Sequence, residues 1–243
     1  FFFLFVSRSL TLAGLFWLLY LALEPYVRRR WPDTLISWSR VLSGSLRDPL
    51  VGRDVLVGVL FGIGAFLILQ CQNLVLIWRG WAGAGAGAGY EVRLETLSGV
   101  RDLIAVGFLD ALTRNIGIWL LSFLLLLLLR ALTRRQWLAA SIWVLIFVVQ
   151  RALTPNDPLI NALFSCLAYT LVVIALFRFG LVTVATNAFV YDLLSTTPLT
   201  TDFSAWYGGY TLAALLAVLA LAGYAFHTSL GGQKLFAGNL LEE

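Results

Sequence analysis

The chain has 243 residues, of which 60% are hydrophobic and only 12% are charged, and its mean hydropathy is +0.88. A soluble globular domain carries about 25% charged residues, so this composition excludes an ordinary water-soluble fold. Seventeen basic residues stand against thirteen acidic ones, an excess that is too small and too dispersed for binding nucleic acid. The apolar runs are continuous rather than alternating, which excludes a membrane β-barrel and favours helices.

These runs predict an all-α fold, a polytopic transmembrane helical bundle built as a single integral membrane domain over residues 1–243. Six spans are expected, at about residues 9–25, 55–78, 103–130, 137–150, 159–178 and 208–227. A seventh apolar segment, 181–194, is short and contains Asn187 and Asp192, so the sequence leaves open whether it crosses the membrane. Residues 79–102 form a long loop, in which a strict Ala-Gly alternation is typical of a flexible linker.

Residues 33–46 predict a helix that lies on the membrane surface. Asp33 can cap this helix, and apolar residues including Leu35 and Leu42 recur at helical spacing. A basic and aromatic cluster precedes the helix, and at head-group depth it should bind anionic lipid. With two residues of the helix itself, the predicted lipid-binding set is Arg28, Arg29, Arg30, Trp31, Trp38 and Arg40. A plain topology signal is the alternative reading of these arginines, and the two roles are compatible.

The arginines also predict the orientation of the chain. Six arginines lie between residues 21 and 56, more than in any other loop. Because arginine-rich loops stay on the cytoplasmic side, the loop from Arg28 to Arg53 is predicted to be cytoplasmic. The chain begins at Phe1 and contains no methionine, so we expect it to be a fragment of a longer protein.

Three glycines are the predicted helix-packing residues. Gly58 and Gly62 form a G-x-x-x-G pair, and Gly64 follows. Small residues at this spacing let a second helix approach closely, although glycine is also simply common in membrane helices. The second half of the same span carries three polar residues within 70–73, so that face should look into the bundle or toward a partner.

No catalytic motif is found, and an enzyme is not expected from this chain. The single histidine, His227, rules out a His-rich metal site, and the residues of nucleotide-binding and kinase motifs are missing. His227 follows the apolar part of the last span, where its imidazole could bind the metal of a tetrapyrrole pigment or haem. The alternative is an ordinary interfacial histidine.

Two stretches of the sequence resemble a known family. ALEPYVRRRWPDTLISWSRVLSG at residues 22–44 and RDPLVGRDVLVG at 47–58 resemble the C-terminal multi-span membrane domain of bacterial membrane-anchored serine/threonine protein kinases, and the tail from Ser229 is similar too. The resemblance implies a bacterial inner membrane and a cytoplasmic kinase domain upstream of residue 1. None of the kinase's functional residues has a matching position here, so the resemblance implies a membrane domain and assigns no activity to it.

Two classes of function follow. The first is a non-enzymatic scaffold or accessory subunit of a larger membrane complex, such as a photosynthetic reaction centre or another bioenergetic assembly, with lipids, carotenoid or chlorophyll at its periphery. The second is a sensory or anchoring membrane domain that biases a kinase through a rearrangement of its helices. A transporter is the third and weakest reading, because no repeat between halves is found. The expected partners are anionic lipids and other membrane proteins.

Overall fold

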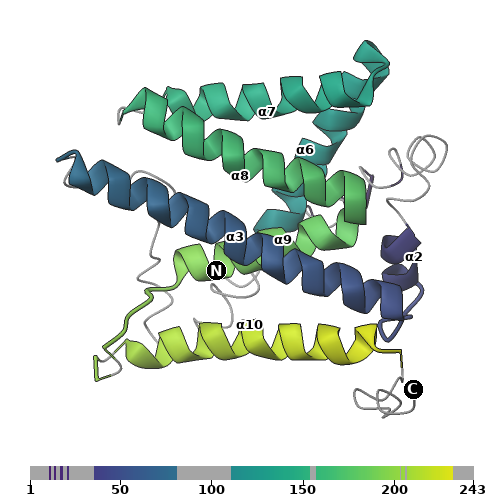
Figure 1. The fold of residues 1–243 in the computed structure, drawn as a ribbon. Helices are drawn as coiled ribbons and strands as arrows, with labels where there is room; N and C mark the ends of the chain where they lie inside the picture. The colour runs from purple at the N-terminus through teal and green to yellow at the C-terminus, as the bar shows by residue number, and fades with distance from the viewer. Residues whose placement is uncertain are drawn as a thin grey trace, which may run out of the picture.

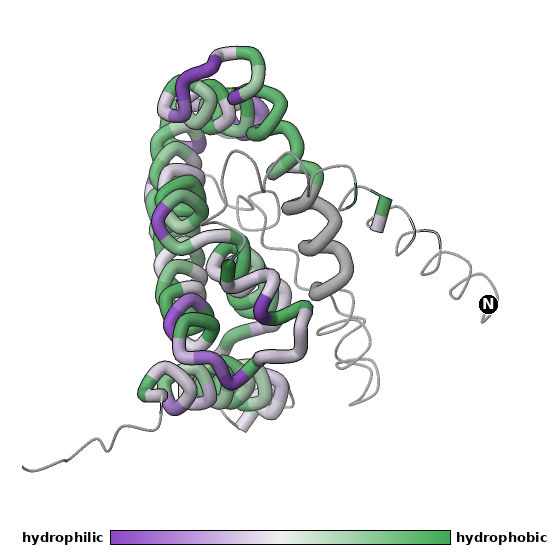
Figure 2. The backbone as a smooth tube through the Cα atoms, turned by 90° about the vertical axis from the view of Figure 1, so that its right-hand side faces the viewer, coloured by the Kyte–Doolittle hydropathy of each residue, from purple (hydrophilic) through white to green (hydrophobic). Residues whose placement is uncertain are grey.

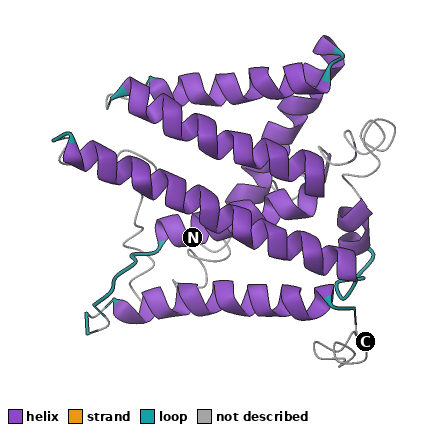
Figure 3. Cartoon of the chain, viewed as in Figure 1, coloured by secondary structure: helices purple, strands orange, loops and turns teal. Residues whose placement is uncertain are grey.

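The computed structural model of the chain (Figure 1) describes residues 36–80, 111–153, 157–202, 204–205 and 207–231, together with five positions between 11 and 21. Of residues 111–120 only the backbone is described. All regular secondary structure within these residues is helical (Figure 3). The helices are α2 (Ile36–Leu42), α3 (Pro49–Trp78), α6 (Ala111–Thr133), α7 (Gln136–Ala152), α8 (Pro158–Phe179), α9 (Leu181–Thr196) and α10 (Gly208–Ser229).

Three of these helices are long and apolar enough to cross a membrane. They are α3 with 30 residues, and α8 and α10 with 22 residues each. At a rise of about 1.5 Å per residue they are about 45 Å and 33 Å long, against a hydrocarbon core of about 30 Å. The chain is therefore an all-α, multi-pass membrane protein, as the composition predicts.

Both α3 and α8 begin at an Asp-Pro step. The carboxylate of Asp48 accepts a hydrogen bond from the backbone N–H of Leu50 at 2.9 Å, and that of Asp157 accepts one from Leu159 at 3.2 Å. Proline suits the first turn of a helix, because an N–H group there has no partner within the helix. For this reason α3 begins at Pro49, earlier than the predicted start at residue 55.

The surface helix is shorter than predicted. α2 ends at Leu42 and turns follow to residue 48, whereas the prediction continued the helix to residue 46. Gly44 adopts a φ of +82°, a left-handed conformation that stops a helix. Several predicted segments lie outside the described residues, namely 33–35, most of 9–25, 81–102 and 103–110.

α9, the short segment that the sequence leaves open, is the central helix. It contacts α2, α3, α6, α8 and α10, and in Figure 1 it lies behind α3, with α7 and α8 on one side and α10 on the other. Eleven of its 16 residues are buried. A helix surrounded by protein needs no apolar outer face, which explains how Thr183 and Asn187 can sit within it at 0% and 2% exposure.

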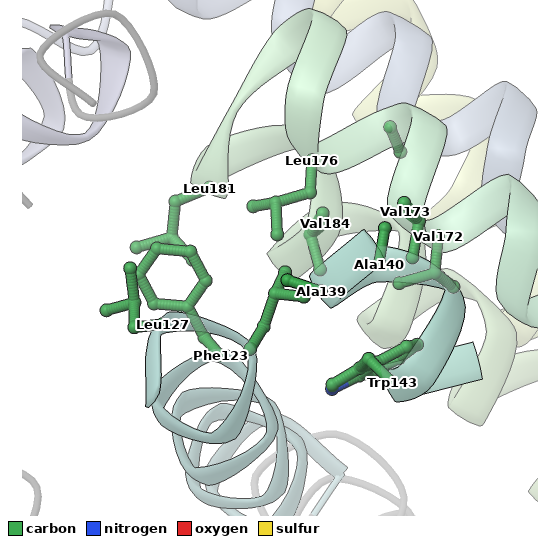
Figure 4. Close-up of a cluster of buried hydrophobic side chains, with 12 residues drawn as sticks. Phe123, Leu127, Ala139, Ala140, Trp143, Val172, Val173, Leu176, Leu181 and Val184 are labelled. Carbon is green, nitrogen blue, oxygen red and sulfur yellow. The ribbon is translucent and has the colours of Figure 1, made fainter. Parts of the chain in front are cut away.

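Two large apolar clusters, and a small one around Leu76 and Ile160, fill the spaces between the helices. The first joins α6, α7, α8 and α9 around Trp143 (Figure 4). The indole N–H of Trp143 donates to the carbonyl oxygen of Ser122 at 3.0 Å, and its ring meets Tyr169 edge-on with 5.9 Å between centroids. The second cluster joins α3, α9 and α10 through residues such as Val59 and Val190. The indole N–H of Trp143 thus has a hydrogen-bond partner although it lies within the first apolar cluster.

The outer surface of the bundle is apolar. Hydrophobic residues occupy most of the helical backbone in Figure 2, and large leucines point outward from α3, α6, α7, α8 and α10. Trp78, at the C-terminal end of α3, is 90% exposed, and Trp137, in the first turn of α7, is 63% exposed. These two helix termini lie at opposite ends of the bundle, where exposed tryptophans match the aromatic belts of membrane interfaces.

Candidate functional site

The contact between α3 and α9 is built on glycine. A Cβ placed on Gly58 would lie 2.6 Å from the Cβ of Thr186 and 2.7 Å from the carbonyl oxygen of Thr183. A Cβ on Gly62 would lie 2.8 Å from the Cβ of Val190. Glycine is therefore required at both positions, because the two parallel helices approach closer than any side chain allows.

Gly64 plays a different part from the other two predicted packing residues. A Cβ placed on it would meet only a methyl group of Leu171 on α8, at 4.0 Å, which is ordinary van der Waals contact. Gly52, which was not singled out in the sequence, is more constrained. A Cβ there would lie 2.6 Å from the backbone nitrogen of Ser229 and 2.8 Å from the carbonyl oxygen of Ala225. Glycine thus also brings α3 against the C-terminal end of α10.

Arginine gathers at one end of the bundle. Among the side chains that the structure describes, seven arginines belong to α2, to the start of α3 or to the neighbouring ends of α6, α7 and α8 (Figure 1), namely Arg40, Arg47, Arg53, Arg130, Arg134, Arg135 and Arg178. Arg79 and Arg151 lie at the opposite end. The bundle therefore has one strongly basic end, with two of the predicted lipid-binding residues, Trp38 and Arg40, on α2.

The two residues on α2 are held in place by neighbouring elements. Arg40 forms an ion pair with Asp48, the cap of α3, and this guanidinium lowers the pKa of the Asp48 carboxyl below its ordinary value. Trp38 is half-buried and packs against the first apolar cluster. The remaining predicted lipid-binding residues, 28–31, lie outside the described part of the chain.

Asp54 is a buried acidic residue that the sequence does not reveal as such. It is 1% exposed, and its carboxylate accepts hydrogen bonds from the Ser37 hydroxyl of α2 and from the Arg53 guanidinium, the latter at 2.8 and 3.0 Å. The Thr183 hydroxyl of α9 donates to the carbonyl oxygen of the same residue at 2.9 Å. Recognising Asp48-Pro49 as a helix start would have placed Asp54 within α3. The residue therefore ties α2, α3 and α9 together.

Polar residues in the second half of α3 look into the bundle, as predicted. The amide of Gln72 donates to the side-chain oxygen of Asn161 on α8 at 2.6 Å, and both side chains are 3% exposed. The side chain of Asn73 donates to that of Gln70 at 2.9 Å. At the end of α3, Arg79 pairs with Asp157, the cap of α8, at 2.9 Å. The hydrogen bond from Gln72 to Asn161 and the ion pair of Arg79 with Asp157 thus fix α3 against α8.

A cavity of about 150 Å³ lies between α3, α7, α8 and α9. Ser165, Tyr169, Asn187, Tyr191 and Arg151 contribute polar groups to its wall, and the remaining lining residues are aliphatic. The hydroxyl oxygen of Ser165 and the side-chain oxygen of Asn187 have no hydrogen-bond partner among the described residues, although the two side chains are 1% and 2% exposed.

His227, the predicted pigment or haem ligand, lies exposed in the last turn of α10. Its pigment-ligand role stays a prediction. Within the described residues, no group of three or more His, Cys, Asp and Glu side chains is arranged to hold a metal ion. Comparison of the chain with models of protein families, with curated proteins and with solved structures finds no match.

Proposed function

We propose that the chain is a non-enzymatic accessory subunit that packs against a larger membrane protein complex through the outer face of α10. In this proposal α6, α7 and α9 cross the bacterial inner membrane together with the three long helices and the span predicted at residues 9–25. The observation that supports the proposal is the asymmetry of α10. One face of this helix has small residues and packs against α3, whereas the opposite face has exposed leucines and glycines.

The inner face of α10 consists of small or β-branched residues with at most 6% exposure, namely Thr211, Ala214, Val218, Ala225 and Thr228. The outer face carries Leu212, Leu216, Leu219 and Phe226, which are 45 to 65% exposed, together with the exposed glycines Gly209 and Gly223. A Cβ on either glycine would meet nothing within 4 Å. Only 22% of the most apolar part of α10 is buried, against 39% for α8.

Heptad spacing and glycine together favour another helix, rather than lipid alone, as the neighbour of this face. Residues 209, 212, 216, 219, 223 and 226 alternate in steps of three and four, the spacing by which paired helices interlock. Glycine fills no space against lipid tails, but it lets a second helix approach closely. The occupant of this face is therefore a transmembrane helix of another subunit.

In this proposal the subunit binds to a multi-subunit bioenergetic complex, for example a photosynthetic reaction centre. Carotenoid, chlorophyll or lipid would fill the remaining gaps at such an interface. His227 lies two turns beyond Leu219 on α10, so a pigment bound there would border the same contact. This pigment role depends on the docking itself.

A glycine substitution tests the docking without disturbing the bundle. Gly223→Leu should leave folding unchanged, because its side chain points into open space, yet it should occupy the position of the partner helix. We expect the wild-type chain to be recovered from native membranes in gentle detergent at a fixed ratio to other membrane proteins, and Gly223→Leu to be recovered alone. Leu67→Ala, on the exposed face of α3, is the matched control and should keep the partners. Recovery of the wild type alone, or as a dimer of itself, would contradict the proposal.

The proposed orientation places the arginine-rich end in the cytoplasm and follows from the positive-inside rule. It is tested in a chain in which Cys71 and Cys166, the free cysteines, are replaced by serine. A membrane-impermeant maleimide added to intact spheroplasts should label Ser204→Cys, in the loop before α10, and should not label Ser45→Cys, in the turn before α3. The opposite labelling pattern would invert the proposed topology.

A second candidate, a sensory membrane domain of a serine/threonine kinase, is favoured by the cavity between α3, α7, α8 and α9. A ligand held between four helices could stabilise one arrangement of them over another. The discriminating observation is the reading frame upstream of Phe1, which should encode an ATP-binding domain if this candidate is right.

A further inference from the structure

Two residues that line the cavity, Ser165 and Asn187, each have a buried side-chain oxygen without a hydrogen-bond partner among the described residues. Ser165 comes from α8 and Asn187 from α9, and both side chains line the same space. A buried polar group without a partner is destabilising, so natural proteins seldom leave two such groups in one cavity. The pair therefore indicates that something other than the described residues completes these hydrogen bonds.

The size of the cavity limits what can occupy it. Cavities of about 150 Å³ accept one benzene-sized molecule. Ordered water needs two to four polar partners per molecule, but Ala65, Leu69, Ala168, Val172 and Ala188 make half of the lining aliphatic. A single molecule of the size of one six-membered ring therefore fits this partly apolar and partly polar wall better than a cluster of water molecules does.

The chemistry of the wall limits the ligand further. The side-chain oxygen of Asn187 can only accept a hydrogen bond, so the ligand must supply an O–H or N–H donor. The hydroxyl of Ser165 can donate to or accept from that same group. Arg151 is the one charged residue that lines the cavity, and the other nine lining residues are uncharged, so most of the wall suits a neutral molecule. The rings of Tyr169 and Tyr191 provide aromatic surface for stacking or edge contact.

We propose that this cavity is a binding site for a neutral, ring-sized molecule bearing a hydroxyl group, the chemical class of phenols, whose hydroxyl donates to Asn187 and accepts from Ser165. The site lies between α3, α7, α8 and α9 and shares no residue with the outer face of α10, so it is independent of the docking proposed above. It holds for an accessory subunit and for a sensory domain alike.

Two probes of equal size test the hydroxyl requirement. 4-Fluorophenol and 4-fluorotoluene differ only in a hydroxyl against a methyl group, and ¹⁹F NMR can follow each in the presence of the purified chain in mild detergent. We expect a saturable bound signal for 4-fluorophenol and an affinity for it about tenfold higher than for 4-fluorotoluene, because two hydrogen bonds to the hydroxyl are lost with toluene. Empty micelles correct for partition of both probes into detergent.

Variants then assign the binding to the cavity. Ser165→Ala and Asn187→Leu should each remove most of the preference for 4-fluorophenol. Asn73→Leu, the same replacement at a buried asparagine outside the cavity, is the matched control and should keep it. If Asn187→Leu fails to fold, Ser165→Ala decides the result, since it removes only one oxygen atom. Equal affinity for the two probes, no saturable binding of either, or a preference that survives Ser165→Ala would overturn the proposal.

Discussion

The hydroxyl of Ser37 donates to the carboxylate of Asp54, so the surface helix α2 is fastened to the buried beginning of α3. The two residues are 17 positions apart, and both are less than 10% exposed. This bond places α2 against the bundle, where Trp38 reaches the first apolar cluster.

Removing the carboxylate should therefore loosen α2 and lower stability. Asp54→Ala leaves the buried Ser37 hydroxyl without its acceptor, which should cost about 1 to 3 kcal/mol in the free energy of unfolding. Ser37→Ala should cost less, because Arg53 still pairs with the carboxylate. Denaturant unfolding in detergent measures both. Ser43→Ala, at an exposed serine bonded within its own turn, is the control and should change little. An Asp54→Ala chain as stable as the wild type would refute this role.

The glycines of α3 should respond to alanine in opposite directions. Gly58→Ala and Gly62→Ala place a methyl group within 3 Å of α9, and overpacking of this kind costs about 1 to 3 kcal/mol. Gly64→Ala creates only an ordinary contact, so the better helix propensity of alanine should stabilise the chain by up to about 1 kcal/mol. Thermal unfolding of the three variants gives the comparison. Equal effects at all three positions would show that the close approach is absent.

The bond between Gln72 and Asn161 should carry measurable coupling between α3 and α8. Interhelical hydrogen bonds in membrane proteins contribute about 0.6 to 2 kcal/mol, so a double-mutant cycle with Gln72→Leu and Asn161→Leu should give a coupling energy in this range. The cycle is read from unfolding free energies of the four chains. The same replacement at Asn73 paired with Asn161→Leu is the control and should be additive, because no hydrogen bond joins these two side chains in the structure. A coupling energy near zero for Gln72 and Asn161 would contradict the prediction.

Asp48 should make stability depend on pH at the acid end. Its pKa in the folded chain is lowered from 3.8, chiefly by Arg40, so its contribution is present above the unfolded pKa and is lost as the pH falls through the folded value. Asp48→Asn keeps a capping oxygen but no charge. We expect the melting temperature of the wild type to fall more steeply than that of Asp48→Asn below pH 3.8.

Asp202 also has a lowered pKa, because Ser204 donates to it, but it is present in both chains and cancels in the comparison. The difference between the two melting curves therefore isolates Asp48. Parallel melting curves for wild type and Asp48→Asn across the acid range would show that the ion pair with Arg40 contributes nothing.

Patterns that depend on residues near in sequence were predictable. Continuous apolar runs predict helices wherever the solvent is lipid, and the G-x-x-x-G spacing of Gly58 and Gly62 puts both on one face of α3. The start of α3 also has a local signal, because Asp48-Pro49 is typical of a helix N-terminus. The arginines on both sides of this dipeptide instead favoured the prediction of a surface loop.

Features that depend on distant neighbours were not predictable. Nothing near Asp54 indicates that Ser37 and Thr183 will meet it, because those contacts join residues from three helices. The cavity likewise needs four helices to form, so Ser165 reads in the sequence as one small polar residue within an apolar run. The length of α9 was predictable from its apolar segment, but its central position depends on how the other helices surround it.

The burial of α9 has a consequence for how the chain is made. A 16-residue helix with Thr183 and Asn187 on it would leave the translocon poorly by itself, because lipid does not solvate these groups. α3 and α8 both precede α9 in the chain, and α3 presents the glycine surface that receives it. The order of synthesis therefore supplies a protein surface for α9 before α9 emerges, and in the proposed topology its insertion becomes a step of assembly rather than of partitioning into lipid.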